Sequence, residues 1–127
     1  MSDTAKRLEA LNAEYEEILK QQQELASETS TVKEELQKAE RTSIDIKSEL
    51  TLAAESYSKL LKSDEDDEEE INLAQDKMSE LEMKLDESKV AIEMLCQKLK
   101  AIGAMKADVG AMAEELAAHM EKVAEAS

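Results

Sequence analysis

The stretch Tyr57–Met78, YSKLLKSDEDDEEEINLAQDKM, decides the fold of this chain. It joins two amphipathic segments through a run of seven acidic residues, Asp64–Glu70, that directly follows Ser63. A seven-residue repeat of apolar side chains keeps one phase on both sides of this run, from Leu8 to Val123. Such a repeat matches the 3.5-residue spacing of helices that supercoil around each other. The sequence therefore predicts an all-α coiled coil.

The apolar seam of the repeat is well defined. With Leu8 at heptad position a and Leu11 at position d, 27 of the 32 seam positions are hydrophobic, against 42% of the whole chain. The seam consists of Leu8, Leu11, Tyr15, Ile18, Gln22, Leu25, Thr29, Val32, Leu36, Ala39, Ser43, Ile46, Leu50, Ala53, Tyr57, Leu60, Ile71, Ala74, Met78, Leu81, Leu85, Ser88, Ile92, Leu95, Leu99, Ile102, Lys106, Val109, Ala113, Leu116, Met120 and Val123. Burial of these side chains is the expected source of stability.

The composition is that of long solvated helices. The 127 residues include no Trp, Phe or Pro and only two glycines, while 37% of them are charged. We predict one coiled-coil domain over residues 1–127, with a helix over about 4–62, an acidic turn over about 63–67 and a helix over about 68–125. Because glycine has a low helix propensity, an interruption of the second helix near 103–110 is an alternative to a continuous helix.

Complementary layers favour a hairpin over a continuous rod. Folding the chain about the acidic run brings together residues whose numbers sum to 131, so that Ala39 faces Ile92 and Ser43 faces Ser88. The charged flanking pairs then have opposite signs: Glu35 with Lys98, Glu49 with Lys84, Lys47 with Glu82, and Glu40 with Lys89. A parallel homodimer would instead juxtapose several like charges. We predict a long antiparallel two-helix coiled-coil hairpin with an acidic tip, forming part of a larger helical bundle or complex.

The acidic run also contains a start signal for the second helix. Ser63 followed by Asp66 fits a capping box, and the acids up to Glu70 would interact favourably with the helix dipole. The tip comprises Asp64, Glu65, Asp66, Asp67, Glu68, Glu69 and Glu70. We interpret it as a solvated turn, with a landing site for a basic protein as the alternative; calcium is the weakest alternative, because the run lacks the ligand spacing of an EF-hand loop.

Charge and motifs exclude several functional classes. The net charge of −15 argues against nucleic acid and anionic membrane surfaces, and no apolar stretch is long enough for membrane insertion. No nucleophile, phosphate-binding or metal-ligand motif is present, so we expect no enzyme, no cofactor and no metal site. The single Cys96, interpreted as a small buried hydrophobe, fits a reducing compartment. We expect an intracellular, cytoplasmic protein, with the nucleus also compatible.

Two sets of residues outside the seam point to partners. From Ala101 to Ala126 the chain carries nine alanines and both glycines, and small side chains on a helix flank allow another helix to approach closely. The candidate partner-binding residues are Leu19, Ala26, Gly103, Met105, Gly110 and Met112. The second set comprises off-seam apolar residues that a larger bundle would bury: Leu19, Ile44, Leu52, Leu61, Leu73, Met83, Val90, Met94 and Cys96. High helix propensity of alanine and ordinary scattered surface residues are the alternative explanations.

These features predict a non-enzymatic structural or interaction subunit of an intracellular assembly, acting as scaffold, spacer or tether. Its partners would be other coiled-coil or helical chains, in a homo- or hetero-oligomer. The paired terminal helices resemble prefoldin, which implies a holdase chaperone subunit as one alternative, although Leu60–Leu73 lacks the strand pattern of prefoldin. The acidic heptad composition is also similar to that of tropomyosin and myosin rods. An acidic binder of basic proteins such as histones, acting through Asp64–Glu70, is the other alternative.

Overall fold

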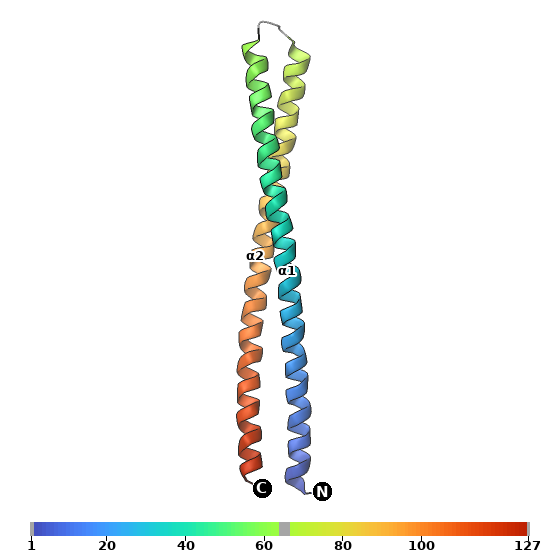
Figure 1. The fold of residues 1–127 in the computed structure, drawn as a ribbon, viewed down its shortest axis with the longest axis vertical. Coiled ribbons are helices and arrows are strands. Elements are labelled where there is room, and N and C mark those ends of the chain that lie inside the picture. The colour runs from blue at the N-terminus through green and yellow to red at the C-terminus, as the bar shows by residue number, and fades with distance from the viewer. Residues whose placement is uncertain (1, 64–66, 127) are drawn as a thin grey trace. The chain divides into compact units, whose positions relative to one another are not determined.

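The protein is an all-α helical hairpin, as predicted. A computed structural model describes residues 2–63 and 67–126. Helix α1 spans Asp3–Lys62 and helix α2 spans Glu68–Glu125, and the two pack against each other in opposite directions (Figure 1). Helix α1 begins one residue before the predicted segment, and α2 has the predicted bounds.

The hairpin consists of two compact units. The loop-side unit comprises Glu34–Cys96, and the terminal unit combines Met1–Lys33 with Gln97–Ser127. Each unit is a pair of antiparallel segments, one from α1 and one from α2. In the terminal unit, the start of α1 and the end of α2 lie at the same end (Figure 1). The expectation of a single domain over 1–127 stays a prediction.

The seam is where the heptad pattern places it. Every seam position except Lys106 is buried or half-buried, and Lys106 is exposed. The buried apolar residues of the terminal unit are Ile18, Val32, Ile102, Ala113 and Val123. In the loop-side unit, Leu81 is the buried apolar residue, and Ser43, in another layer of the same seam, is also buried. A lysine can leave a seam because its long stem carries the ammonium group out to water.

Two hydrogen bonds within the loop-side unit report the register of the helices. The Gln75 Nε2 group donates to the Tyr57 hydroxyl over 2.8 Å, and the Ser88 hydroxyl donates to the Ala39 carbonyl over 3.5 Å. The predicted register pairs Tyr57 with residue 74 and Ser88 with residue 43. Both contacts therefore agree with that register to within about one helical turn.

Helix α1 ends without a left-handed residue. The Ser63 N–H donates to the carbonyls of Lys59 and Leu60 over 3.1 and 3.3 Å, which closes the last turn. No described residue has a positive φ angle. Lys59 and Lys62 lie in the last turn, where positive charge stabilises the carbonyl end of a helix dipole. The absence of Gly or Asn between Lys59 and Glu70 therefore does not prevent the hairpin.

The residue that caps α2 is Asp67, whereas the predicted capping box pairs Ser63 with Asp66, which lies outside the described residues. Helix α2 begins at Glu68, and the Glu70 N–H donates to Asp67 Oδ1 over 3.3 Å. Asp67 immediately precedes the first helical residue, which is the N-cap position. Glu68, Glu69 and Glu70 fill the first turn, where acidic side chains favour the helix dipole.

Helix α2 is continuous through 103–110, so the alternative of an interruption there is wrong. Neither Gly103 nor Gly110 has a positive φ angle, and both lie within the helix. Glycine lowers helix stability by about 1 kcal/mol relative to alanine but keeps both backbone hydrogen-bonding groups. The surrounding seam residues Ile102, Val109 and Ala113 pack against α1 and hold the helix in register.

The charged residues that flank the seam do not form the predicted ion pairs between the helices of the loop-side unit. None of the three interhelical ion pairs predicted within the loop-side unit, Glu49 with Lys84, Lys47 with Glu82 and Glu40 with Lys89, forms among the residues described. Lys84 Nζ instead lies 3.4 Å from Glu80 Oε1, one turn earlier on the same helix, with both side chains more than half exposed. A pair on one helix is already held in position by the backbone, whereas an exposed interhelical pair must order two long side chains.

Candidate partner-binding surfaces

Large apolar side chains are exposed on both units. Their exposed fractions run from 41% at Leu19 to 65% at Met83. These residues are Leu19, Ile44, Leu52, Leu61, Leu73, Met83, Val90, Met94, Met105 and Met112. All of them lie off the seam, so the hairpin's own core does not bury them. Cys96 is exposed as well, and its interpretation as a buried hydrophobe is wrong because its heptad position e lies beside the seam rather than in it.

The six predicted partner-binding residues all lie in the terminal unit, but not on one surface. Leu19, Ala26, Gly103 and Gly110 occupy position e of the heptad, whereas Met105 and Met112 occupy position g. Positions e and g flank a coiled-coil seam on opposite sides. The set therefore divides into two flanks. We call the e side the small-residue flank, because Ala26, Gly103 and Gly110 lie on it together with Leu19, and the g side the methionine flank.

The small-residue flank is open. Leu19, Ala26 and Gly103 are exposed and Gly110 is half-buried. A Cβ atom added at Gly103 or at Gly110 would meet nothing within 4 Å. Packing inside the hairpin therefore does not require glycine at either position, and this flank is free to receive small or bulky neighbours.

The methionine flank is hollowed in two places. One hollow, of about 310 Å³, is lined by Glu14, Ile18, Met112, Glu115, Leu116 and His119. The other, of about 320 Å³, is lined by Gln21, Glu24, Leu25, Glu28, Met105, Asp108 and Val109. In both, seam residues form the floor, a half-exposed methionine forms part of the wall and carboxylates surround the opening. We call the two hollows together the methionine groove.

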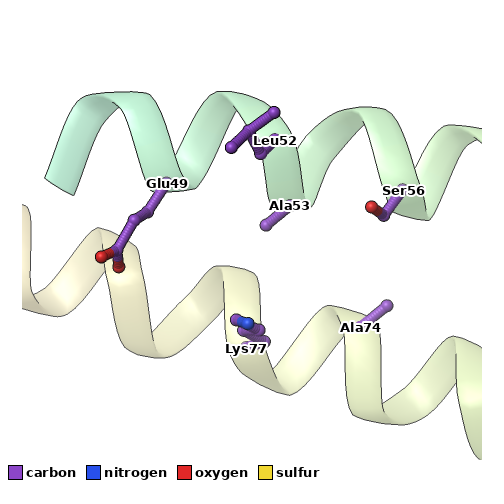
Figure 2. Close-up of a pocket in the computed structure, with 6 residues that line it drawn as sticks. All are labelled: Glu49, Leu52, Ala53, Ser56, Ala74 and Lys77. Carbon is purple, nitrogen blue, oxygen red and sulfur yellow. The ribbon is translucent and has the colours of Figure 1, made fainter. Parts of the chain in front are cut away.

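The loop-side unit has a hollow of a different kind (Figure 2). It has a volume of about 270 Å³ and is lined by Glu49, Leu52, Ala53, Ser56, Ala74 and Lys77. Ala53 of α1 and Ala74 of α2 contribute only methyl groups to adjacent layers of the seam, and the space between the helices is filled incompletely. A second hollow, of about 380 Å³, surrounds Ala39, Ser88 and Ala91 for the same reason.

The polar seam residues of the terminal unit are accommodated in two ways. Gln22 and Thr29 remain half-buried, and the Thr29 hydroxyl donates to the Leu25 carbonyl over 2.8 Å. Lys106 leaves the seam. A hydroxyl bonded to the preceding turn needs no interhelical partner, so Thr29 imposes no choice of neighbour on the seam.

The acidic run is described only in part. Asp67, Glu68, Glu69 and Glu70 are exposed, whereas the predicted tip residues Asp64, Glu65 and Asp66 lie outside the described residues. Within residues 2–63 and 67–126, no group of three or more His, Cys, Asp or Glu side chains is placed to hold a metal ion. No helix in these ranges is long and apolar enough to cross a membrane.

No known protein family, no curated protein and no solved structure matches this chain. The likeness to prefoldin therefore stays one of architecture, and the likeness to tropomyosin and myosin rods stays one of composition. The exposed surfaces described above are the basis for a functional proposal.

Proposed function

We propose that this protein is a non-enzymatic interaction subunit of a larger assembly, in which it binds partner helices through faces that its own seam leaves exposed. The observation that carries this proposal is the set of ten large apolar side chains with exposed fractions of 41–65%. Seven of them, from Ile44 to Met94, belong to the loop-side unit, and three, Leu19, Met105 and Met112, belong to the terminal unit.

Energetics support a partner of helical form. Complete burial of a Leu, Ile or Met side chain contributes about 1.5–3 kcal/mol, and a two-helix pair has only one side of each helix on which to achieve it. A third or fourth helix packed on the hairpin would cover the flanks as well as the outer positions. Coiled-coil or helical chains, either copies of this one or others, are therefore the partners we propose, and a scaffold, spacer or tether is the role.

Matched photo-crosslinking tests this proposal. Met94 is 64% exposed and its neighbour Glu93 is also exposed, but the two side chains point about 100° apart around α2. Leu52 and Thr51 form an equivalent pair on α1. A photoreactive phenylalanine derivative at Met94 or Leu52, in cells that make the protein, should yield discrete products with defined proteins. The same group at Glu93 or Thr51 should yield little.

Circular dichroism of each purified variant serves as the folding control. Equal yields at the apolar and polar positions of both pairs would contradict the proposal, because contact would then be unselective. Absence of any product at both Met94 and Leu52 would contradict it as well.

A further inference from the structure

The methionine groove of the terminal unit combines an apolar floor with a rim of one charge sign. Ile18, Leu25, Val109 and Leu116 form the floor. Met105 and Met112 are 49% and 50% exposed. Unbranched thioether side chains adapt to partners of different shape, which suits them to a helix-binding groove.

The charged side chains that line this groove are all acidic. They are Glu14, Glu24, Glu28, Asp108 and Glu115, and no Lys or Arg lines either hollow. The two alanine-lined hollows of the loop-side unit differ, because one is lined by Glu49 with Lys77 and the other by Lys84 with Glu87. The methionine groove therefore carries a charge preference that those hollows lack.

The spacing of the groove matches a helix. Ile18 and Leu25 are seven residues apart on α1, as are Met105 and Met112 on α2. Seven residues rise about 10.5 Å along a helix, so apolar side chains at positions i and i+7 of a third helix would enter successive hollows. Basic residues on either side of that apolar stripe would then face the carboxylates of the rim.

We propose that the methionine groove binds a positively charged amphipathic helix of a partner protein, with its apolar stripe over Met105 and Met112. This inference rests on the proposed function and adds the chemistry of one partner to it. Charge complementarity selects this occupant: a second copy of the chain carries a net charge of −15 and would be repelled by the rim. Partly exposed charges contribute modestly one by one, but five carboxylates act together on a helix that follows the groove.

Three synthetic peptides of identical apolar pattern provide the test. Each has leucine at heptad positions a and d and alanine at b, c and f, and positions e and g are all lysine, all glutamine or all glutamate. Fluorescence anisotropy with the full chain measures their affinities. We expect the lysine peptide to bind at least about tenfold more tightly than the glutamine peptide and the glutamate peptide to bind most weakly. Added salt should weaken only the lysine peptide.

Two triple variants locate the binding. Glu14→Gln, Glu24→Gln and Glu28→Gln remove three charges from the rim, and glutamine preserves helix propensity. The matched control, Glu9→Gln with Glu16→Gln and Glu121→Gln, removes three exposed charges on the side of the small-residue flank. The rim variant should lower the affinity for the lysine peptide by about tenfold, whereas the control should change it by less than about twofold. Circular dichroism verifies that both variants remain helical.

The possible results separate this inference from the proposed function. Equal affinities for the lysine and glutamine peptides would overturn the inference while leaving helix binding in place. If both triple variants lowered the affinity for the lysine peptide equally, net charge alone would explain the effect, and the inference would also be overturned. If the protein formed a homodimer that dissociated in the double variant Met105→Gln, Met112→Gln, the occupant of the groove would be a second copy of the chain, and the inference would be overturned. If no peptide binds, the inference fails, and the proposed function then depends on crosslinking at Leu52 and Met94.

Discussion

The two units of the hairpin bury their seams to different extents although both follow the same heptad phase. The terminal unit buries five apolar side chains, four of which are β-branched: Ile18, Val32, Ile102 and Val123. The loop-side unit buries one apolar side chain, Leu81, together with the polar Ser43. Yet the terminal unit contains the polar seam positions Gln22, Thr29 and Lys106. The number of apolar seam residues therefore does not predict how tightly each half packs.

Side-chain shape contributes to the difference. A branch at Cβ keeps the bulk of isoleucine and valine close to the backbone, which favours burial between the helices, but Ile46, Ile71 and Ile92 of the loop-side unit are only half-buried. In the loop-side unit, Ala39, Ala53, Ala74 and Ser88 are too small to fill their layers. Tyr57 and the seam leucines of this unit other than Leu81 are half-buried. Hairpin pairing is maintained, but with less apolar contact in each layer.

The largest test of this comparison uses one substitution at one heptad position in each unit. Ile102 of the terminal unit is 2% exposed, whereas Ile46 of the loop-side unit is half-buried, and both occupy position d. We expect Ile102→Ala to lower the free energy of unfolding by about 4 kcal/mol and Ile46→Ala by about 2 kcal/mol. Urea denaturation followed by circular dichroism measures both. Equal losses would show that the two seams are packed equally well.

The glycines of the terminal unit provide the second test. Gly103→Ala and Gly110→Ala should each raise the free energy of unfolding by about 0.8–1 kcal/mol, because the added methyl group meets no atom within 4 Å. Ser79→Ala, at an exposed helical position of the loop-side unit, should raise it by only about 0.5 kcal/mol. Thermal melts compare the three variants. Destabilisation by either glycine substitution would mean that the small-residue flank is already occupied, for example by a second chain.

The helix caps provide a third and smaller test. Asp67 caps α2 in the loop-side unit, and Ser2 caps α1 in the terminal unit through a 3.2 Å bond from the Ala5 N–H. Asp67→Ala should cost about 1 kcal/mol, because the uncapped turn adjoins the seam residue Ile71. Ser2→Ala should cost only a few tenths of a kcal/mol, since the first turn of α1 can fray before Leu8. Asp67→Asn should restore most of the loss; failure to do so would argue against a capping role.

The smallest expected effect concerns Lys84. A double-mutant cycle with Glu80→Gln and Lys84→Gln should give a coupling energy of about 0.3–0.5 kcal/mol, because both side chains are exposed and solvent screens the pair. The corresponding cycle between Glu49 and Lys84 should give a coupling near zero. A larger coupling energy for Glu49 with Lys84 than for Glu80 with Lys84 would instead support the interhelical ion pairs predicted from the sequence.

Much of the fold could be predicted because a heptad repeat is a local property of the chain. Leu8 and Leu11 set a phase that correctly identifies the seam as far as Val123, and the acidic run locates the turn. Details that depend on atomic geometry were predicted less well. The exposure of Cys96 differs from the sequence interpretation by a small rotation around the helix, and the interhelical ion pairs do not form among the described residues of the loop-side unit.

The candidate surfaces could be predicted as a set of residues but not as an arrangement. Leu19 and Gly103 were correctly placed outside the seam together with Met105 and Met112, since position in the heptad separates flank from core. The meeting of Met105 with Glu24 and Asp108 around one hollow requires both helices in place.

The sequence by itself determined that two helices would form, where each would begin and end, and which stripe they would share, because helical periodicity and charge act along a single segment. Only the tertiary structure decided how deeply each seam residue is buried, which charges pair, and where carboxylates from both helices gather around Met105 and Met112. Burial and charge gathering depend on what the opposing helix contributes to each layer, and that contribution exists only after the chain has folded back on itself.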